Sequence, residues 1–453
     1  MTDPKAPKAI WPDIPEPLMP YSPAVKAADW IFVSGQLASD FKTGIAPDAI
    51  PSNPNLENEQ ALQSKFVMET LKRTLEAGGA DISKDVARIW QWLPWETPTY
   101  EDFKSGNSWP DGLSITPYLD TRNEYIFDPR PASTAVSIRA LPVRNAHIEI
   151  DMIAITDGSK PEGFSPGPEV PMPLAGYSPA LRRGDWVFLA GDVPTDWVGD
   201  YGEARHMGPE SALAKEARVN PHVWYGSEIE QQTDYVLWKL DKIAASAGAS
   251  LKRAVKAEVY IGHPSDYQGM DAVWKKWFPE NPPARVVIPY MGLGTRGSRI
   301  EIALTLLTDD SNLEIETIET SEAPEPFSHE PQAVKVGNFL FLSQQMACDS
   351  KGVLAPGMVR HENFPWYGQP GQNQMRYMMK NVAAICEAGG TSVENIVRRA
   401  CFHSEGDIFA DSIEEWSKYF TGVKPASTTM KIGGPLVVEG ANTLLDLIAY
   451  VPD

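Results

Sequence analysis

An arginine and a glutamate in the middle of the chain have the side chains best suited to chemistry. Arg285 lies in the segment Pro-Pro-Ala-Arg-Val-Val, and Glu301 follows sixteen residues later in Arg-Ile-Glu-Ile-Ala. A guanidinium offers two parallel donors that match a carboxylate, and it stays charged at physiological pH. A partly desolvated glutamate at the end of a strand can accept a proton from water and return it. The pair therefore predicts a site for a small acid, and the structural alternative is an interdomain ion pair of Arg285, which could involve Glu301 itself.

The sequence around these residues belongs to one of three tandem copies of a single pattern. The matching segments begin at Tyr21, Tyr177 and Glu330, and each continues into an apolar strand and a polar turn. The period of about 155 residues is the size of a small domain and is too long for a solenoid repeat. Polar residues that survive in one copy and are lost in another cannot be explained by shared architecture, so they are the best indication of function.

Each copy contains the same succession of predicted elements. An aromatic and β-branched strand comes first (residues 30–33, 186–189 and 339–342), and a long amphipathic helix follows a variable loop. In the middle copy Gly248 is expected to end that helix in a left-handed conformation. A second strand, a shorter helix and two final strands complete the unit. This order predicts an α+β module in which two helices cover one face of a mixed sheet.

Two segments without periodic apolar character separate the copies. Residues 157–176 are rich in proline and glycine, residues 309–328 are acidic, and both are predicted to be linkers. The predicted modules are module 1 (1–156), module 2 (177–308) and module 3 (329–453). The free face of each sheet must be buried, and the other two sheets are the obvious partners.

The context of Arg285, the spacing to Glu301, Tyr177 and the Ala-Gly-Asp turn at Gly191 resemble the signature of the RidA/YjgF family of enamine and imine deaminases. The resemblance covers nearly the whole chain, three times. It implies a chorismate mutase-like fold and, because family members are usually homotrimers with sites between subunits, an intramolecular pseudo-trimer with up to three clefts. It assigns Arg285 to the substrate carboxylate and Glu301 to the water that hydrolyses a carbon–nitrogen double bond, with no cofactor.

The other two copies depart from this pattern. Serine stands at the arginine position in both of them, as Ser133 and Ser427. The third copy has also lost the tyrosine, the glycine and the glutamate, which are replaced by Glu330, Gln344 and Leu444. At most one cleft is therefore expected to retain the full set, and the serines mark either inactive clefts or clefts with a new task.

The first copy keeps three residues of the pattern, which we expect to contribute to substrate binding together with Tyr177 and Gly191: Tyr21, Gly35 and Glu149. The tyrosines could instead pack against their own sheets, and the glutamates could be strand-edge carboxylates in solvent. Trp224-Tyr225-Gly226 and Trp366-Tyr367-Gly368 could form an aromatic wall over a flat substrate or pack between domains.

Other features limit the function further. Residues 292–297 match the Gly-x-Gly-x-x-Gly pattern, but strands are expected on both sides, so we interpret them as a hairpin and not as a dinucleotide site. The net charge of −20 disfavours nucleic acid as a partner. The three cysteines and seven histidines lack metal-ligand spacing. No apolar run reaches the length of a membrane span, and no secretory signal is visible, which indicates a cytoplasmic protein.

Three hypotheses follow for a small carboxylated ligand. The first is cofactor-independent deamination of an imine or enamine. The second is another reaction in the same cleft, such as a lyase, tautomerase or ring-opening step, because the insertions 40–57, 106–129 and 197–223 could reshape a pocket. The third is a non-catalytic metabolite-binding or scaffold protein. Further self-association of the pseudo-trimer stays open.

Overall fold

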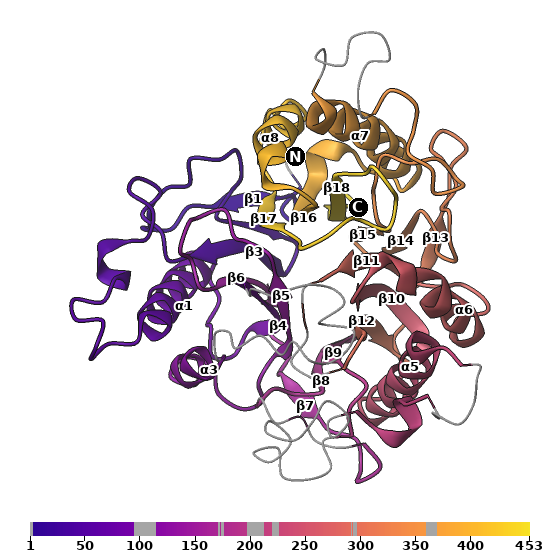
Figure 1. Cartoon of the computed structure of the whole chain (residues 1–453), viewed down its shortest axis with the longest axis horizontal. Coiled ribbons are helices and arrows are strands. Elements are labelled where there is room, and N and C mark those ends of the chain that lie inside the picture. The colour runs from indigo at the N-terminus through magenta and orange to yellow at the C-terminus, as the bar shows by residue number, and fades with distance from the viewer. Residues whose placement is uncertain are drawn as a thin grey trace.

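The chain forms three mixed sheets of six strands, each with helices on its outer side (Figure 1). The computed structural model describes residues 3–94, 115–170, 173, 176–196, 213–219, 226–290, 292, 297–358 and 369–453. The strand order is the same in all three sheets, with the penultimate strand of each module at one edge and parallel to its neighbour, and the other pairs antiparallel. The prediction of three α+β modules is therefore confirmed.

Across each sheet the strands run from a three-residue edge strand to the parallel pair at the opposite edge. Module 1 contains β1 (Lys8–Ile10), β2 (Ala24–Ala27), β3 (Trp30–Leu37), β6 (Glu149–Ile155), β4 (Val86–Pro94) and β5 (Ala132–Ile138). Module 2 contains β7 (Glu162–Phe164), β8 (Ala180–Arg183), β9 (Trp186–Asp192), β12 (Ile300–Thr308), β10 (Ala249–Ile261) and β11 (Ala284–Pro289). Module 3 contains β13 (Glu316–Ile318), β14 (Ala333–Val336), β15 (Phe339–Leu342), β18 (Thr443–Tyr450), β16 (Ile396–His403) and β17 (Ala426–Lys431).

Among the described residues, two α-helices in each module lie outside its sheet (Figure 1). They are α1 (Glu59–Ala77) and α3 (Thr116–Arg122), α5 (Glu228–Ser246) and α6 (Tyr267–Trp277), and α7 (Pro370–Ala388) and α8 (Phe409–Ser417). Short 3-10 helices are η1 (Pro47–Ala49), η3 (Lys215–Ala217), η4 (Pro264–Asp266), η5 (Val393–Asn395) and η6 (Gly406–Ile408).

The long helix of module 2 shows why the local sequence folds as predicted. Ser227 caps its first turn by accepting a hydrogen bond from the Glu230 amide. Its buried face includes four residues at helical spacing, Ile229, Val236, Leu240 and Ile243. Gly248 follows the helix with φ +74°, a left-handed conformation that favours glycine, as predicted.

The two segments interpreted as linkers do more than connect modules. Residues 162–164 form β7, which pairs with β8, and residues 316–318 form β13, which pairs with β14. Each segment thus adds an edge strand to the sheet that follows it. Strands of three residues are too short to show an alternating pattern, which is why the sequence did not reveal them.

The inner faces of the three sheets meet in one apolar core. Trp30 of module 1 lies 4.9 Å from Trp186 of module 2 and 4.9 Å from Phe339 of module 3, measured between ring centroids. Trp186 of module 2 also contacts Phe341 of module 3, with 5.9 Å between the ring centroids. Because aromatic side chains bury large areas, this cluster holds the three modules together, and the predicted pseudo-trimer is present.

A ring of buried ion pairs also joins the modules. Arg88 of module 1 binds Glu258 of module 2 at 3.1 Å, and Lys256 of module 2 binds Asp446 of module 3 at 2.6 Å. Arg398 of module 3 contacts Asp151 of module 1 at 3.2 Å. Each module thus contributes to two intermodule pairs. The chain ends meet as well, because Lys5 forms an ion pair with Asp453.

Several sequence features fall partly or wholly outside the described residues. These are the two Trp-Tyr-Gly motifs except for Gly226, most of the glycine-rich segment 292–297, most of the insertion 197–223 and the first part of the insertion 106–129. Within the part that is described, no helix has the length and apolar character to cross a bilayer. No group of three potential metal-ligating side chains is found there either, and the three cysteines are buried and unpaired.

Candidate functional site

Arg285 lies on β11 and is fully buried, with two carboxylates of the protein bound to it. Its Nε donates to Glu330 at 2.8 Å, and its Nη2 donates to Asp271 at 2.7 Å and to the Ser328 hydroxyl at 3.0 Å. Burial alone would lower the pKa of the guanidinium, but the neighbouring Glu330 and Asp271 raise it overall. The donors that were expected to hold a substrate carboxylate are therefore occupied by side chains of the protein.

Arg285 and Glu301 lie at two different interfaces, which corrects the expectation that they share one cleft. The Arg285 amide donates to the hydroxyl of Ser343 in module 3. Glu301 instead lies against Gly191, where a Cβ would be 1.9 Å from its Oε1 and 2.8 Å from Thr134 of module 1. The reason is the strand order, since β10 separates the edge strand β11, which faces module 3, from the central strand β12, whose Glu301 faces module 1.

The same kind of contact occurs at all three interfaces, which we name by the modules that meet there. At the 2/3 interface, β11 meets the turn that contains Gln344, whose amide donates to the Arg285 carbonyl. At the 3/1 interface, β17 meets the turn that contains Gly35, whose amide donates to the Thr428 hydroxyl at 3.1 Å. At the 1/2 interface, β5 packs against β9, which carries Gly191.

Each interface therefore combines the parallel edge strand of one module (β5, β11 or β17) with the Gly191, Gln344 or Gly35 position and the last strand (β12, β18 or β6) of the next. At the 3/1 interface, Ser427 faces the turn of module 1 and donates its amide to the Ser34 hydroxyl at 2.8 Å. The residues at the family positions are grouped as follows: Ser133 with Tyr177, Gly191 and Glu301 at 1/2, Arg285 with Glu330, Gln344 and Leu444 at 2/3, and Ser427 with Tyr21, Gly35 and Glu149 at 3/1.

Both glutamates at the family position are buried carboxyl groups with raised pKa values. Burial raises the pKa of Glu301 to about 8, with Asp192 and Glu258 adding to the effect and Arg88 opposing it. Burial also raises the pKa of Glu149 well above its ordinary value. Oε2 of Glu149 has no hydrogen-bond partner among the described residues. Both groups can therefore hold a proton near neutral pH and release it to a partner.

Glycine is required at the two positions that receive these carboxyl groups, which lie within β3 and β9 where the strand register shifts. A Cβ on Gly35 would lie 1.8 Å from Oε1 of Glu149, a distance that no real side chain allows. Gly191 stands in the same relation to Glu301. The glycine at each turn thus lets a carboxyl group lie directly on the backbone at the interface. Tyr177 and Gly191 also border a hollow of about 10 Å³, the room for about one water.

Comparison with known proteins shows which protein family the chain is related to. A family model described as endoribonuclease L-PSP matches residues 168–307 and 320–435, more than half of the sequence. The chain belongs to this family. The match leaves out module 1, but the identical strand order shows that module 1 has the same fold.

Individual relatives of this endoribonuclease L-PSP family chain each match about one module. A 3-aminoacrylate deaminase, RutC, of Acinetobacter baylyi is 30% identical over 143 residues, which are 32% of this chain and 90% of the relative. A 2-iminobutanoate/2-iminopropanoate deaminase of Dermatophagoides farinae is 27% identical over 146 residues, 32% of this chain and 93% of the relative. The crystal structure of RidA from an Antarctic Psychrobacter is 22% identical, with a TM-score of 0.25, and covers 32% of this chain and 98% of its own. The resemblance to RidA/YjgF is thus confirmed.

The L-PSP family positions are most altered at the 2/3 interface. Gln344 donates to Glu330 at 2.8 Å, so the side chains at the glycine and tyrosine positions bind each other. Leu444 is buried and apolar where the other copies have glutamate. This interface keeps the family arginine but has no carboxyl group at the glutamate position, and its arginine is neutralised internally.

Sequence reasoning missed another fully buried arginine at an interface, Arg399 on β16. Its Nη1 donates to the hydroxyl of Ser427 at 2.9 Å, at the interface whose arginine position holds serine. The sequence offered one signal, since two consecutive arginines in a strand, Arg398 and Arg399, place one charge on each face of the sheet. The pattern alone did not show which of them would lack a carboxylate partner.

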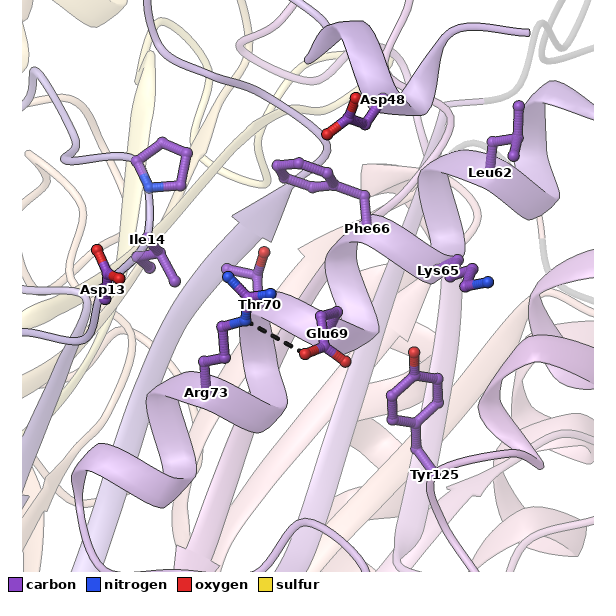
Figure 2. A pocket seen from close by; sticks show the side chains of 11 residues that line it. Asp13, Ile14, Asp48, Leu62, Lys65, Phe66, Glu69, Thr70, Arg73 and Tyr125 are labelled. Atoms are coloured by element: carbon purple, nitrogen blue, oxygen red, sulfur yellow. Dashed lines mark hydrogen bonds and ion pairs between the residues drawn. The ribbon is translucent and has the colours of Figure 1, made fainter.

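A larger hollow, of about 670 Å³, lies away from the three interfaces on module 1 (Figure 2). Phe66, Lys65 and Arg73 of α1 line it together with Tyr125, and Arg73 is paired with Glu69 at 3.2 Å. It contains none of the residues named as site residues from the sequence, although Asp48 of the insertion 40–57 lines it, and its charged side chains are of both signs. We therefore place the candidate site at the interfaces and not in this hollow.

Proposed function

We propose that the chain hydrolyses a small carboxylate-bearing imine or enamine at the 3/1 interface, with Glu149 as the proton-transferring group. The observation that carries this proposal is the buried carboxyl of Glu149, which lies on the Gly35 turn with one oxygen unpaired among the described residues. Its raised pKa suits a group that donates and accepts a proton in turn. Two relatives that are named as deaminases support the reaction class.

The chemistry needs one water and one shuttling proton. Glu149 in its neutral form donates a proton to the imine nitrogen, which makes the carbon a better electrophile. The carboxylate that results accepts a proton from the water that adds to this carbon. The tetrahedral intermediate then takes that proton on nitrogen and returns its hydroxyl proton to the Glu149 carboxylate as ammonia leaves, which gives the carbonyl product and restores the neutral carboxyl group. Overall, one imine and one water give one ketone and one ammonia, and the reaction consumes no cofactor.

Glu301 supports a second site of the same kind at the 1/2 interface. It has the same contact with a glycine turn and a pKa of about 8. Ser133 stands at the arginine position there, and its hydroxyl donates to Gln91 at 3.0 Å. Glu149 and Glu301 are therefore both assigned to proton transfer, and Arg285 is assigned to holding modules 2 and 3 together.

The test uses the full chain and two isosteric substitutions, Glu149→Gln and Glu301→Gln. The substrate 2-iminopropanoate is generated in place from alanine by an amino acid oxidase, and its conversion to pyruvate is followed against the spontaneous rate. We expect Glu149→Gln to lower kcat at least about 100-fold, the usual weight of a proton-transfer group. The double variant should show no acceleration at all. Wild-type kinetics in both single variants and in the double variant would refute the proposal.

A binding protein without catalysis is the second candidate. It is favoured by one observation, that no interface combines an arginine at its family position with a glutamate at its family position. Binding of pyruvate by the wild-type chain, with no acceleration of imine hydrolysis, would support this alternative. Cleavage of RNA, which the family description suggests, is disfavoured by the net charge of −20.

A further inference from the structure

The guanidinium of Arg399 lies in module 3 where the guanidinium of Arg285 lies in module 2. The Arg399 guanidinium carbon is 4.8 Å from the ring of Trp416, and that of Arg285 is 4.8 Å from the ring of Trp274. The two tryptophans hold equivalent places, each ten residues before the first residue of the parallel edge strand of its module, β17 or β11. Arg285 comes from this edge strand, whereas Arg399 comes from the neighbouring strand.

The strand register explains how arginines from neighbouring strands place their guanidinium groups in the same position. Arg399 on β16 pairs directly with Ser427 on β17, so the small serine leaves room for a side chain from the next strand. In module 2 the arrangement is reversed, because Ala257 on β10 pairs with Arg285 on β11. One arginine and one small residue therefore occupy the same pair of positions in opposite order. The arginine that is missing at Ser427 is supplied from one strand away.

The two arginines differ in what neutralises them. Arg285 has Asp271, three residues before Trp274, and Glu330. At the matching positions around Arg399 the chain has Ile413, three residues before Trp416, and Tyr21 of module 1. Both carboxylates of the 2/3 interface are thus replaced by uncharged side chains at the 3/1 interface.

Arg399 consequently has no carboxylate partner among the described residues, and it is fully buried. Its Nε and Nη2 have no hydrogen-bond partner there either, while Nη1 donates to Ser427 and to the hydroxyl of Thr429. Its neighbour Arg398, by contrast, contacts Asp151 and Asp446. A buried cation without a counter-charge is unfavourable, and two free N–H groups of one guanidinium match the two oxygens of a carboxylate.

The other groups near Arg399 are neutral. Burial raises the pKa of the Cys401 thiol, and the adjacent Arg399, which interacts with this thiol, opposes the shift without reversing it, so the thiol stays protonated. Burial and then Arg399 lower the pKa of His403 to about 3, so its ring carries no charge near neutral pH. His403 contacts the Cys401 sulfur at 3.3 Å and the Thr443 hydroxyl at 3.2 Å. A single positive charge among neutral groups is suited to a ligand with one negative charge.

The geometry points to Arg399 as the residue that binds the ligand carboxylate at the 3/1 interface, in place of the arginine missing at Ser427. The site would take a small monocarboxylate, and the identification of that ligand as an imine rests on the proposed function. Thr429 connects the two halves of the site. Its hydroxyl accepts from Arg399, and its backbone N–H donates to the carboxyl of Glu149. The anion-binding group and the proton-transferring group thus come from different modules across one interface.

The test measures pyruvate binding to the full chain by calorimetry, together with KM and kcat for 2-iminopropanoate. Arg399→Ala should weaken pyruvate binding and raise KM by about 10- to 100-fold, as expected for the loss of hydrogen bonds to a charged group. Arg376→Ala is the matched control, because this arginine lies in the same module and its side chain is 55% exposed. Glu149→Gln should lower kcat and leave pyruvate binding near its wild-type value.

Two further variants separate ligand binding from a purely structural role. Adding Ser427→Arg to Arg399→Ala returns the guanidinium to the family position and should restore pyruvate binding. Ile413→Asp supplies an internal carboxylate like Asp271, so it should raise the melting temperature and weaken pyruvate binding. A structural arginine would show the first effect of Ile413→Asp without the second.

The outcomes distinguish this inference from the proposed function. Unchanged pyruvate binding in Arg399→Ala, or a wild-type chain that binds no pyruvate, overturns the role of Arg399 even if Glu149→Gln abolishes turnover. Binding that depends on Arg399, without any imine hydrolysis by the wild type, confirms the carboxylate site and removes the proposed function. If Arg399→Ala does not fold, unchanged binding in Ile413→Asp overturns the inference.

Discussion

Replacement of Arg285 by methionine should destabilise the protein and leave its chemistry intact. The substitution removes the cation from Glu330 and Asp271, whose side chains are 1% and 9% exposed. Asp271 keeps Lys275 at 2.8 Å, so the unpaired charge is mainly that of Glu330. Breaking a buried ion pair by removing one partner costs about 3–5 kcal/mol.

The change in melting temperature depends on the size of the unit that unfolds. With an unfolding entropy of about 2.1 cal/mol/K per residue, the loss corresponds to about 3–5 °C if all 453 residues unfold together. It corresponds to about 10–15 °C if a single module of roughly 150 residues unfolds by itself. Calorimetric melting of Arg285→Met therefore also reports the cooperativity of the three modules.

Two further variants serve as controls for this measurement of stability. Adding Glu330→Gln removes the orphaned charge, so the double variant should be more stable than Arg285→Met alone. Arg73→Met removes an exposed ion pair with Glu69 and should change stability by no more than about 0.5 kcal/mol. The reasoning is refuted if Arg285→Met melts like the wild type and loses its turnover, because Arg285 would then act on substrate as the sequence suggested.

Three other predictions concern the carboxyl sites and the core. Between pH 4.5 and about 8 the folded chain holds a proton on Glu301 that the unfolded chain releases. This contribution to the free energy of unfolding is therefore complete below pH 4.5 and is lost as the pH rises through 8. In urea unfolding measured against pH, Glu301→Gln should remove a fall in this free energy of up to about 1.4 kcal/mol per pH unit. Gly191→Ala should displace the Glu301 carboxyl group and lower any turnover at the 1/2 interface, which is assayed in a chain that also carries Glu149→Gln. The control Gly434→Ala has open space around its Cβ and should leave this turnover unchanged. Trp30→Ala should lower the free energy of unfolding by about 3–5 kcal/mol in denaturant, because Trp30 lies in the central aromatic core. Trp11→Ala, at a residue that is 55% exposed, should lower it by less than about 0.5 kcal/mol. Equal losses in the two variants would contradict the role of this core.

The elements of each module were predictable because their signals are local. The face of α5 and its end at Gly248 follow from spacing within twenty residues, and the first strand of each module follows from its aromatic and β-branched residues. The edge strands β7 and β13 were not predicted, because three residues carry no usable periodicity. Their partners, and not their own sequences, determine that they are strands.

The site was predictable only as a set of residue types, because its two halves come from different modules. Glu149, Glu301, Gly35 and Gly191 were named from the sequence as site residues, and the structure places each glutamate against the glycine of its own module. Their role in catalysis stays a prediction. The assignment of Arg285 to Glu301 failed because β10 lies between their strands, a matter of long-range strand order. Arg399 could not be recognised, since its importance depends on the absence of a carboxylate near it among the residues that the structure describes.

The contrast between the 2/3 and 3/1 interfaces leads to one more prediction. Glu330 stands where Tyr21 stands at the 3/1 interface, and it binds Arg285 as a ligand carboxylate would. Glu330→Tyr should therefore release Nε of Arg285, while Asp271 is still shared with Lys275. The variant should bind one more pyruvate per chain than the wild type in calorimetry. Its turnover should not rise, because Leu444 cannot transfer a proton. An unchanged stoichiometry would mean that Glu330 does not occupy a carboxylate site, and a rise in turnover would mean that proton transfer does not need the glutamate position.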